Sequence, residues 1–129
     1  MNSTVTFKGI DKVVKNLSLS NQKVRDAIKF ALEECGGDLL KEATKIVPLD
    51  KGTLQDSGKV SAVKKVSSNE MEISVGYNTP YAARLHEHPE YKFQQGRQGK
   101  YLETPLKQNV SKYKNGIVNE VKSALTGAL

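Results

Sequence analysis

Hydrophobic side chains recur at three- and four-residue steps in two long stretches of the chain, which predicts two amphipathic helices. The first runs from about residue 21 to 46 and stops before Pro48. The second follows Thr104-Pro105 as cap and first helical position and reaches about residue 126. The apolar stripes are Val24, Ile28, Ala31, Leu32, Cys35, Leu39, Ala43 and Ile46 in the first, and Leu106, Val110, Tyr113, Ile117, Val121 and Leu125 in the second.

Two adjacent glycines, Gly36 and Gly37, interrupt the middle of the first helix pattern. Each glycine costs about 1 kcal/mol relative to alanine inside a helix. We therefore expect a kink or a break at this point. The alternative is that the missing side chains let another part of the backbone approach closely.

Alternation of apolar and polar residues predicts the strands. The clearest strand covers residues 71 to 77, where Met71, Ile73, Val75 and Tyr77 share one face. Residues 59 to 66 precede it, and the polar residues 67 to 70 form a hairpin turn between the two. A third short strand is predicted at residues 4 to 8, followed by a short helix at 10 to 17.

Short helical turns are predicted at two further places. Thr53 with Asp56 three residues later resembles a capping box. Thr79 and Pro80 suit the cap and the first position of a helix that ends at Pro89. The predicted fold class is α+β, a small antiparallel sheet packed against the long N-terminal helix, with the C-terminal helix alongside. The 129 residues are expected to form one domain.

Composition adds little chemistry to this picture. Of the 129 residues, 37% are hydrophobic and 6% aromatic, and no apolar run approaches the roughly 18 residues of a membrane helix. The N-terminus has no secretory signal pattern, so we expect folding in the cytoplasm. The single cysteine, Cys35, falls in the apolar stripe, which favours core packing over a catalytic thiol.

The net charge of +6 is concentrated between residues 92 and 114. This segment is the candidate anion-facing surface, and a solvated face is the equally weighted alternative. We expect the polar, glycine-punctuated residues 88 to 100 to be mobile, because they bury too little to offset their ordering entropy. The candidate anion-facing residues are Lys92, Arg97, Lys100, Lys107, Lys112 and Lys114, with Glu103 as the one opposing charge.

Searches for catalytic groups give no convergent set. His86 and His88, flanked by Glu87 and Glu90, could bind a metal, but helix-end polar contacts are favoured because the two rings point in different directions. No nucleophile elbow or phosphate-binding loop is present in the sequence. We therefore expect no enzymatic activity, no cofactor and no metal.

Three segments resemble a known family when read in order. They are Pro48 with Gly52, Leu54 and Ser57; then Val75-Gly76-Tyr77 with Pro80-Tyr81-Ala82-Ala83-Arg84-Leu85-His86-Glu87; and then Gly99-Lys100-Tyr101-Leu102-Glu103-Thr104-Pro105-Leu106. Together they are similar to the small neck proteins of tailed bacteriophages, known as tail-completion, head–tail joining or minor capsid proteins. Many relatives have Glu-Phe-Gly-Thr where this chain has His86-Glu87-His88-Pro89.

The resemblance implies a structural virion protein at the neck, assembled in the host cytoplasm. It implies a ring of copies, hexameric because phage tail tubes are six-fold, between the head connector or adaptor and the tail-tube protein. Transient contact with packaged DNA is also implied, and membrane contact is not. The expected protein-interface residues are Tyr81, Arg84, Glu87 and Tyr101, whose large polar-tipped side chains suit an interface. The alternatives are a minor protein on the capsid or connector periphery and a nucleic-acid-binding module.

Overall fold

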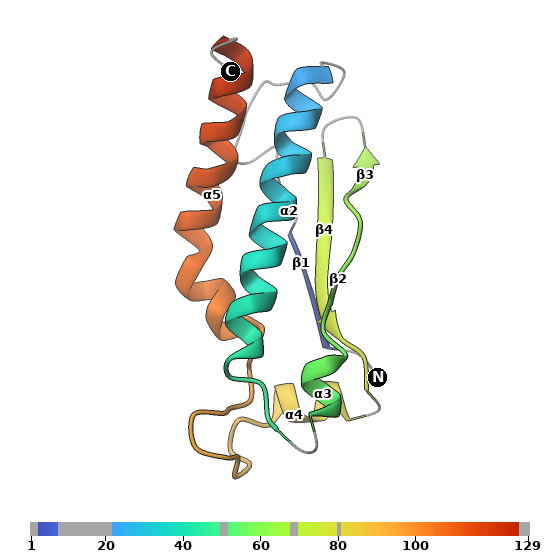
Figure 1. Cartoon of the computed structure of the whole chain (residues 1–129), viewed down its shortest axis with the longest axis vertical. Coiled ribbons are helices and arrows are strands. Elements are labelled where there is room, and N and C mark those ends of the chain that lie inside the picture. Colours follow the sequence, from blue (N-terminus) through green and yellow to red (C-terminus); the bar gives the residue numbers. More distant parts are fainter. Residues whose placement is uncertain (1–2, 8–21, 50–51, 68–69, 80, 127–129) are drawn as a thin grey trace.

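A central strand and a central helix organise the fold in the computed structural model, which describes residues 3–7, 22–49, 52–67, 70–79 and 81–126 (Figure 1). The fold is α+β, as predicted. The strands are β1 (Ser3–Phe7), β2 (Lys59–Val60), β3 (Lys64–Ser67) and β4 (Glu70–Tyr77). The helices are α2 (Gln22–Thr44), α3 (Thr53–Asp56), α4 (Ala82–Glu87) and α5 (Glu103–Thr126). The short helix predicted at residues 10 to 17 lies outside the described residues.

The antiparallel sheet is built around β4, which pairs with β1 on one side and with β2 and β3 on the other. The single strand predicted for residues 59 to 66 is divided in two. Four residue steps separate Val60 from Lys64, but only three separate their partners Val75 and Glu72. One extra residue therefore interrupts the pairing, as in a β-bulge. Periodicity did not show this break, because the bulge changes the register without changing the residue types.

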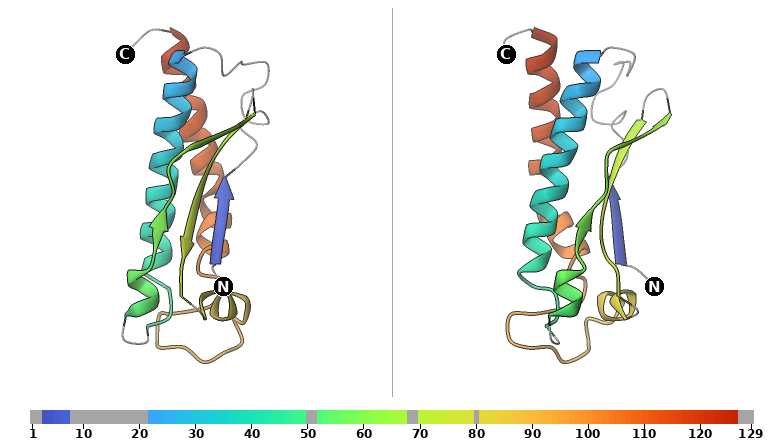
Figure 2. Two further views of the ribbon diagram at one scale, coloured as in Figure 1. Left: turned by 90° about the vertical axis from the view of Figure 1, so that its right-hand side faces the viewer. Right: turned by 45° about the vertical axis from the view of Figure 1, so that its right-hand side comes forward.

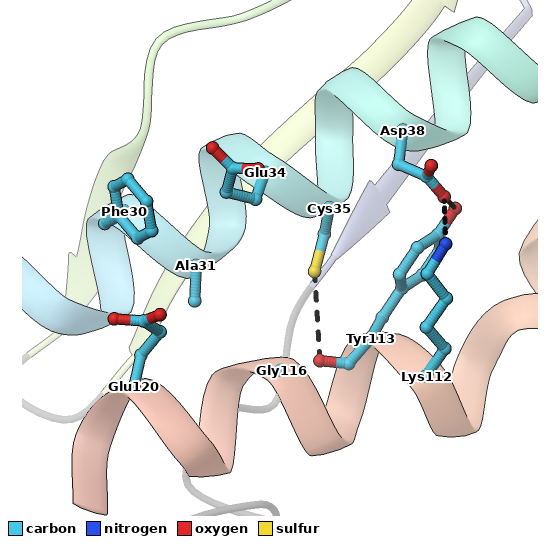
Figure 3. A pocket seen from close by; sticks show the side chains of 9 residues that line it. All are labelled: Phe30, Ala31, Glu34, Cys35, Asp38, Lys112, Tyr113, Gly116 and Glu120. Atoms are coloured by element: carbon cyan, nitrogen blue, oxygen red, sulfur yellow. Dashed lines mark hydrogen bonds and ion pairs between the residues drawn. The ribbon is translucent and has the colours of Figure 1, made fainter. Parts of the chain in front are cut away.

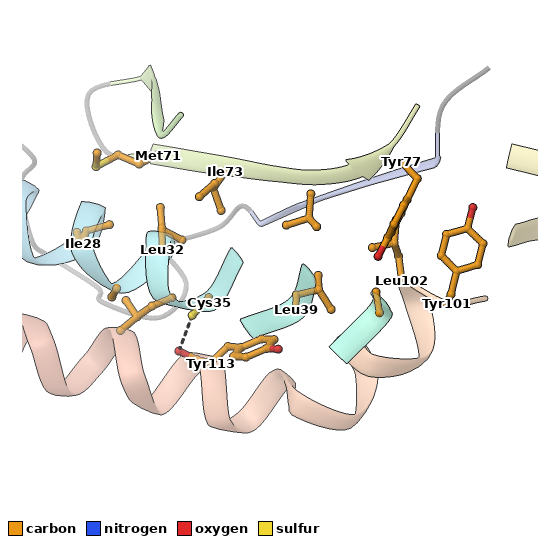
Figure 4. Packing of buried hydrophobic residues seen from close by; sticks show 14 of the residues in the cluster. Ile28, Leu32, Cys35, Leu39, Met71, Ile73, Tyr77, Tyr101, Leu102 and Tyr113 are labelled. Carbon is orange, nitrogen blue, oxygen red and sulfur yellow. Dashed lines mark hydrogen bonds between the residues drawn. The ribbon is translucent and has the colours of Figure 1, made fainter. Parts of the chain in front are cut away.

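Helix α2 lies between the sheet and α5, so the molecule has three layers (Figures 1 and 2). The buried residues of β4, Met71, Ile73, Val75 and Tyr77, form the sheet side of the core. On the other side of α2, Cys35 packs near Tyr113 of α5 (Figure 4). Helix α5 runs antiparallel to α2 and packs mainly on it rather than on the sheet. Helix α2 is thus buried on two sides, which explains its broad apolar stripe.

The predicted kink or break at Gly36-Gly37 is wrong, because α2 continues through both residues. The close-approach alternative explains Gly36. A Cβ atom at Gly36 would lie 2.9 Å from Val60 Cγ1 and 3.1 Å from Ile73 Cδ1. A side chain here would therefore push the sheet away from the helix. At Gly37, nothing lies within 4 Å of the corresponding position.

The predicted threonine caps are also wrong, although the helices predicted to begin near them are present. Helix α3 is preceded by Gly52, whose φ of 79° is in the left-handed region, and Thr53 is inside the helix with no capping hydrogen bond. Helix α4 is preceded by Tyr81, not by Thr79. The Thr79 hydroxyl is instead buried without a hydrogen-bond partner among the described residues. Thr104 lies in the first turn of α5, one residue after its start at Glu103.

Candidate interaction surface

The segment between α4 and α5 is held against the C-terminal end of α2. The Arg97 guanidinium donates hydrogen bonds to the carbonyls of Thr44 and Val47, at 3.0 and 3.3 Å. The backbone amide of Gln98 donates to the carbonyl of Ile46 at 2.8 Å. The Gln94 side chain hydrogen-bonds both the amide and the carbonyl of Leu49. Thr44 is the last residue of α2, so Arg97 satisfies a carbonyl that the helix end leaves unpaired, and its charge suits the negative end of the helix dipole. The other bonds hold the chain that follows α2. They give residues 94 to 98 contacts that the sequence did not predict, while most side chains from residue 91 to 96 are exposed, and the mobility of residues 88 to 100 stays a prediction.

His86 anchors the same segment from the other side. It is 7% exposed, and its Nε2 accepts a hydrogen bond from the Glu103 amide at 3.3 Å. Since Nε2 accepts, the ring proton is on Nδ1, which donates to Glu87 Oε1 at 2.9 Å. The His86 carbonyl accepts from the Lys100 amide at 2.8 Å. His86 therefore joins α4 to the first turn of α5, as its helix-end interpretation predicts.

Tyr101 is at the centre of this junction. It is fully buried, and its hydroxyl donates to Ala82 O at 2.7 Å. Its ring packs edge-on against Tyr77 and His86, with centroids 5.2 and 4.9 Å away. The sequence predicted Tyr101 as an interface residue because its side chain is large and polar-tipped. The structure corrects this, because Tyr101 contacts no solvent and instead positions the residues around it.

These anchors support a surface groove of about 400 Å³ at the end of the molecule beyond α2. The α4 residues Arg84 and Leu85 and the preceding Tyr81 line one side, and Pro48 and Leu49 line another. The remaining wall is the segment Tyr91, Lys92, Phe93 and Gln94. The groove is therefore largely apolar and aromatic, with the exposed cations Arg84 and Lys92 at its edge. Such a surface fits protein binding.

The structure brings two of the four predicted interface residues, Tyr81 and Arg84, into this groove. Glu87 lies outside it, on the exposed side of α4, where it accepts from Lys100 Nζ at 2.7 Å. The hydrogen bond from Lys100 is the main cause that lowers the pKa of Glu87 below its usual value, and His86 contributes. Glu87 is thus engaged within the chain.

Most of the candidate anion-facing residues have partners within the chain. Arg97 binds carbonyls of the α2 end, and Lys100 pairs with Glu87. Lys107 pairs with Glu103 at 3.3 Å, and Lys112 pairs with Asp38 at 3.3 Å. Only the Lys92 and Lys114 side chains have neither an ion pair nor a hydrogen bond in the part of the chain that the structure describes. The Glu103–Lys107 pair has the i, i+4 spacing of a helix and could be expected from sequence, whereas Glu87 of α4 and Asp38 of α2 could not be matched with Lys100 and Lys112 in this way.

Sequence reasoning did not single out several residues of the groove as interface residues, among them Pro48, Leu49, Tyr91 and Phe93. The signal for the last two was present, since they are the aromatic residues of an otherwise polar segment. Tyr91 is 41% exposed and stacks on His88, with ring centroids 4.7 Å apart. An exposed aromatic pair in a polar segment is typical of a contact surface rather than of a core.

The histidines and the cysteine of the chain were the candidates for metal binding and for a reactive thiol. No group of three histidine, cysteine or acidic side chains is placed to hold a metal ion in that part of the chain. His88 contacts Glu90, with Nδ1 and Oε2 2.7 Å apart. Cys35 is buried in the core, and this burial, with Asp38 and Glu34 nearby, raises the pKa of its thiol to about 11. The burial of Cys35 in the core cluster confirms core packing, and the raised pKa of its thiol agrees with this, because a reactive thiol has a lowered pKa. No described helix has the length and apolar character needed to cross a membrane.

Comparison with known proteins gives one family. Residues 11–88 match the family HK97-gp10_like, described as "Bacteriophage HK97-gp10, putative tail-component". The match spans more than half of the chain, and it includes α2, the sheet strands β2 to β4, and α4. No curated protein and no solved structure gives a significant match.

Proposed function

The chain belongs to the HK97-gp10-like family of phage tail components, and we propose that it is the tail-completion or head–tail joining protein of a phage neck. In this proposal the chain acts as one domain, and copies form a closed ring, hexameric to match a six-fold tail tube. The ring contacts the head connector or adaptor on one side and the tail-tube protein on the other. The family match is the observation that carries the proposal.

The groove beyond α2 supports a role in binding other virion proteins. Tyr81, Arg84 and Tyr91 present aromatic rings and a cation on a surface whose support is fixed by buried contacts. Aromatic and arginine side chains are the groups that contribute most at protein interfaces. A structural protein needs such pre-positioned surfaces, because rigid contacts lose less entropy on binding.

The nucleic-acid alternative is weakened by the ion pairs. DNA-binding proteins release counterions by placing lysine and arginine against phosphates. Four of the six candidate cations are engaged by carbonyls or carboxylates of the chain itself. Contact with packaged DNA would therefore be secondary to protein contacts. The choice between a neck ring and a minor protein on the capsid periphery rests on position in the virion.

Cryo-electron microscopy of the parent virion tests the proposal directly. We expect density for this chain as a closed ring in the neck, with the groove beyond α2 against a neighbouring protein. Density confined to the capsid shell would contradict the neck assignment and favour the peripheral capsid role. A ring of other than six copies would correct the copy number only.

A further inference from the structure

A second hollow lies between α2 and α5 and is lined by residues from the middle part of both helices (Figure 3). Its volume is about 340 Å³. The small residues Ala31 and Gly116 leave the space open, and a side chain at Gly116 would meet nothing within 4 Å. Phe30, which is 50% exposed, stands at its edge. The hollow therefore offers an apolar floor and an exposed aromatic wall.

The rim of this α2–α5 hollow is acidic although the chain as a whole is basic. Three carboxylates, Glu34, Asp38 and Glu120, line it beside one cation, Lys112. Asp38 is already engaged, because it pairs with Lys112 at 3.3 Å and accepts from the Tyr113 hydroxyl at 2.8 Å. Glu34 and Glu120 have no ion-pair partner among the residues that the structure describes. The hollow thus fits an aromatic or aliphatic side chain that is accompanied by positive charge.

The chain itself exposes a segment with these properties. Tyr91 is 41% exposed, and Lys92 beside it is exposed and has no charged partner in the described part of the chain. This segment lies beyond the C-terminal end of α2 (Figure 1), whereas the hollow is lined by residues from the middle part of that helix. The two surfaces are therefore too far apart to meet within one molecule, but they can meet between two.

We propose that the α2–α5 hollow of one copy receives Tyr91 and Lys92 of the next copy, with Lys92 between Glu34 and Glu120. The contact uses two different surfaces, so after two copies bind, one still has a free hollow and the other still has a free Tyr91-Lys92 segment. A contact of this kind continues from copy to copy and closes into a ring when its rotation allows. The inference rests on the proposed ring, and it identifies the surfaces that join its subunits.

Disulfide formation between two different cysteine variants of the chain tests the contact even if association is weak. All chains carry Cys35→Ala, and one carries Glu120→Cys while the other carries Lys92→Cys. We expect a mixed disulfide dimer to form at least about tenfold faster than in a control mixture of Glu120→Cys with Lys64→Cys, because proximity raises the effective concentration of the thiols. Lys64 is exposed on β3, away from the proposed contact. Equal rates in the two mixtures would overturn the inference.

Charge reversal supplies the matched test in assembled rings. Glu34→Lys with Glu120→Lys, or Lys92→Glu alone, should weaken association by about tenfold, and combining all three should restore much of it, because like charges at an interface repel. Sedimentation velocity of the full chain, with circular dichroism as a folding check, gives the readout. Failure to restore association would overturn the inference. A neck ring seen in the virion with other surfaces in contact would overturn it too, while leaving the proposed function intact.

Discussion

At the scale of single residues, His86 shows how a polar side chain can be structural while resembling a ligand. It is buried and accepts a hydrogen bond from the first amide of α5, which no helical carbonyl can satisfy. The sequence showed a His-x-His pair and favoured helix-end contacts. It could not show that only the first histidine is buried, because that depends on the chain returning to it at residues 100 to 103.

We expect His86→Ala to lower the free energy of unfolding by about 1–3 kcal/mol, since it leaves the Glu103 amide unpaired in a buried site. The matched change His88→Ala removes an exposed ring and should change stability by less than about 0.5 kcal/mol. Urea unfolding followed by circular dichroism measures both. Equal losses would show that His86 does not hold α5 in place.

At the scale of elements, the sequence predicted the existence of the long helices and of β4, because each has a strong period over many residues. The sequence did not predict the features that depend on contact between two elements. The glycine pair in α2 was read as a local defect, although Gly36 is required by the contact with Val60 and Ile73. Likewise, α5 packs on α2 rather than on the sheet. A stripe of apolar residues shows that a helix face is buried, but it does not show which element buries it.

The two glycines of α2 should respond in opposite ways to alanine. Gly37→Ala should stabilise the chain by about 1 kcal/mol, because alanine favours the helix and the new methyl group enters open space. Gly36→Ala gains the same propensity, but overlap with Val60 and Ile73 should cost about 1–3 kcal/mol. Thermal unfolding of the two variants and the parent compares them directly. A Gly36→Ala chain as stable as Gly37→Ala would mean that the sheet shifts freely.

The segment from 88 to 100 provides the second test at this scale. Because Arg97 and Gln98 are bound to the end of α2, we expect trypsin to cut slowly after Arg97 and Lys100 in the free chain. Gly99→Ala should accelerate both cuts, since its Cβ would lie 2.8 Å from Leu85 O and 2.9 Å from Pro89 Cα, which are backbone atoms. Gln95→Ala, at an exposed position, is the control. Rapid cleavage of the parent chain would confirm a mobile segment.

At the scale of the whole molecule, α2 is the only described helix that contacts both the sheet and α5 to any large extent. The layers are therefore held together through it. Asp38 is the polar link between α2 and α5, as it binds both Tyr113 and Lys112. Its burial tends to raise its pKa, but the hydrogen bonds from Tyr113 and Lys112 outweigh that effect and lower the pKa below its usual value.

This lowered pKa makes stability depend on acid in a defined direction. The unfolded chain takes up a proton at Asp38 at a higher pH than the folded chain does, so the stabilisation is present above about pH 4 and is lost as pH falls further. Asp38→Asn should therefore be less stable than the parent at pH 7, by about 1 kcal/mol, and the difference should shrink towards pH 2. Urea unfolding at several pH values measures it, with Asp26→Asn as control. A difference that stays constant with pH would exclude the carboxylate as its source.

The pairing of β1 with β4 has a consequence for how the protein is made. Ser3 is paired with Tyr77, so 74 residues of chain must be synthesised after the first residue of β1 before its last partner exists. At about 5–20 residues per second, translation takes roughly 4–15 s to cover that distance. Helix α2 is synthesised in the same interval, before β4 and α5, the two elements that it mainly packs against. Strand β1 and the amphipathic helix α2 are therefore both synthesised before β4, the strand that pairs with β1 and packs on α2.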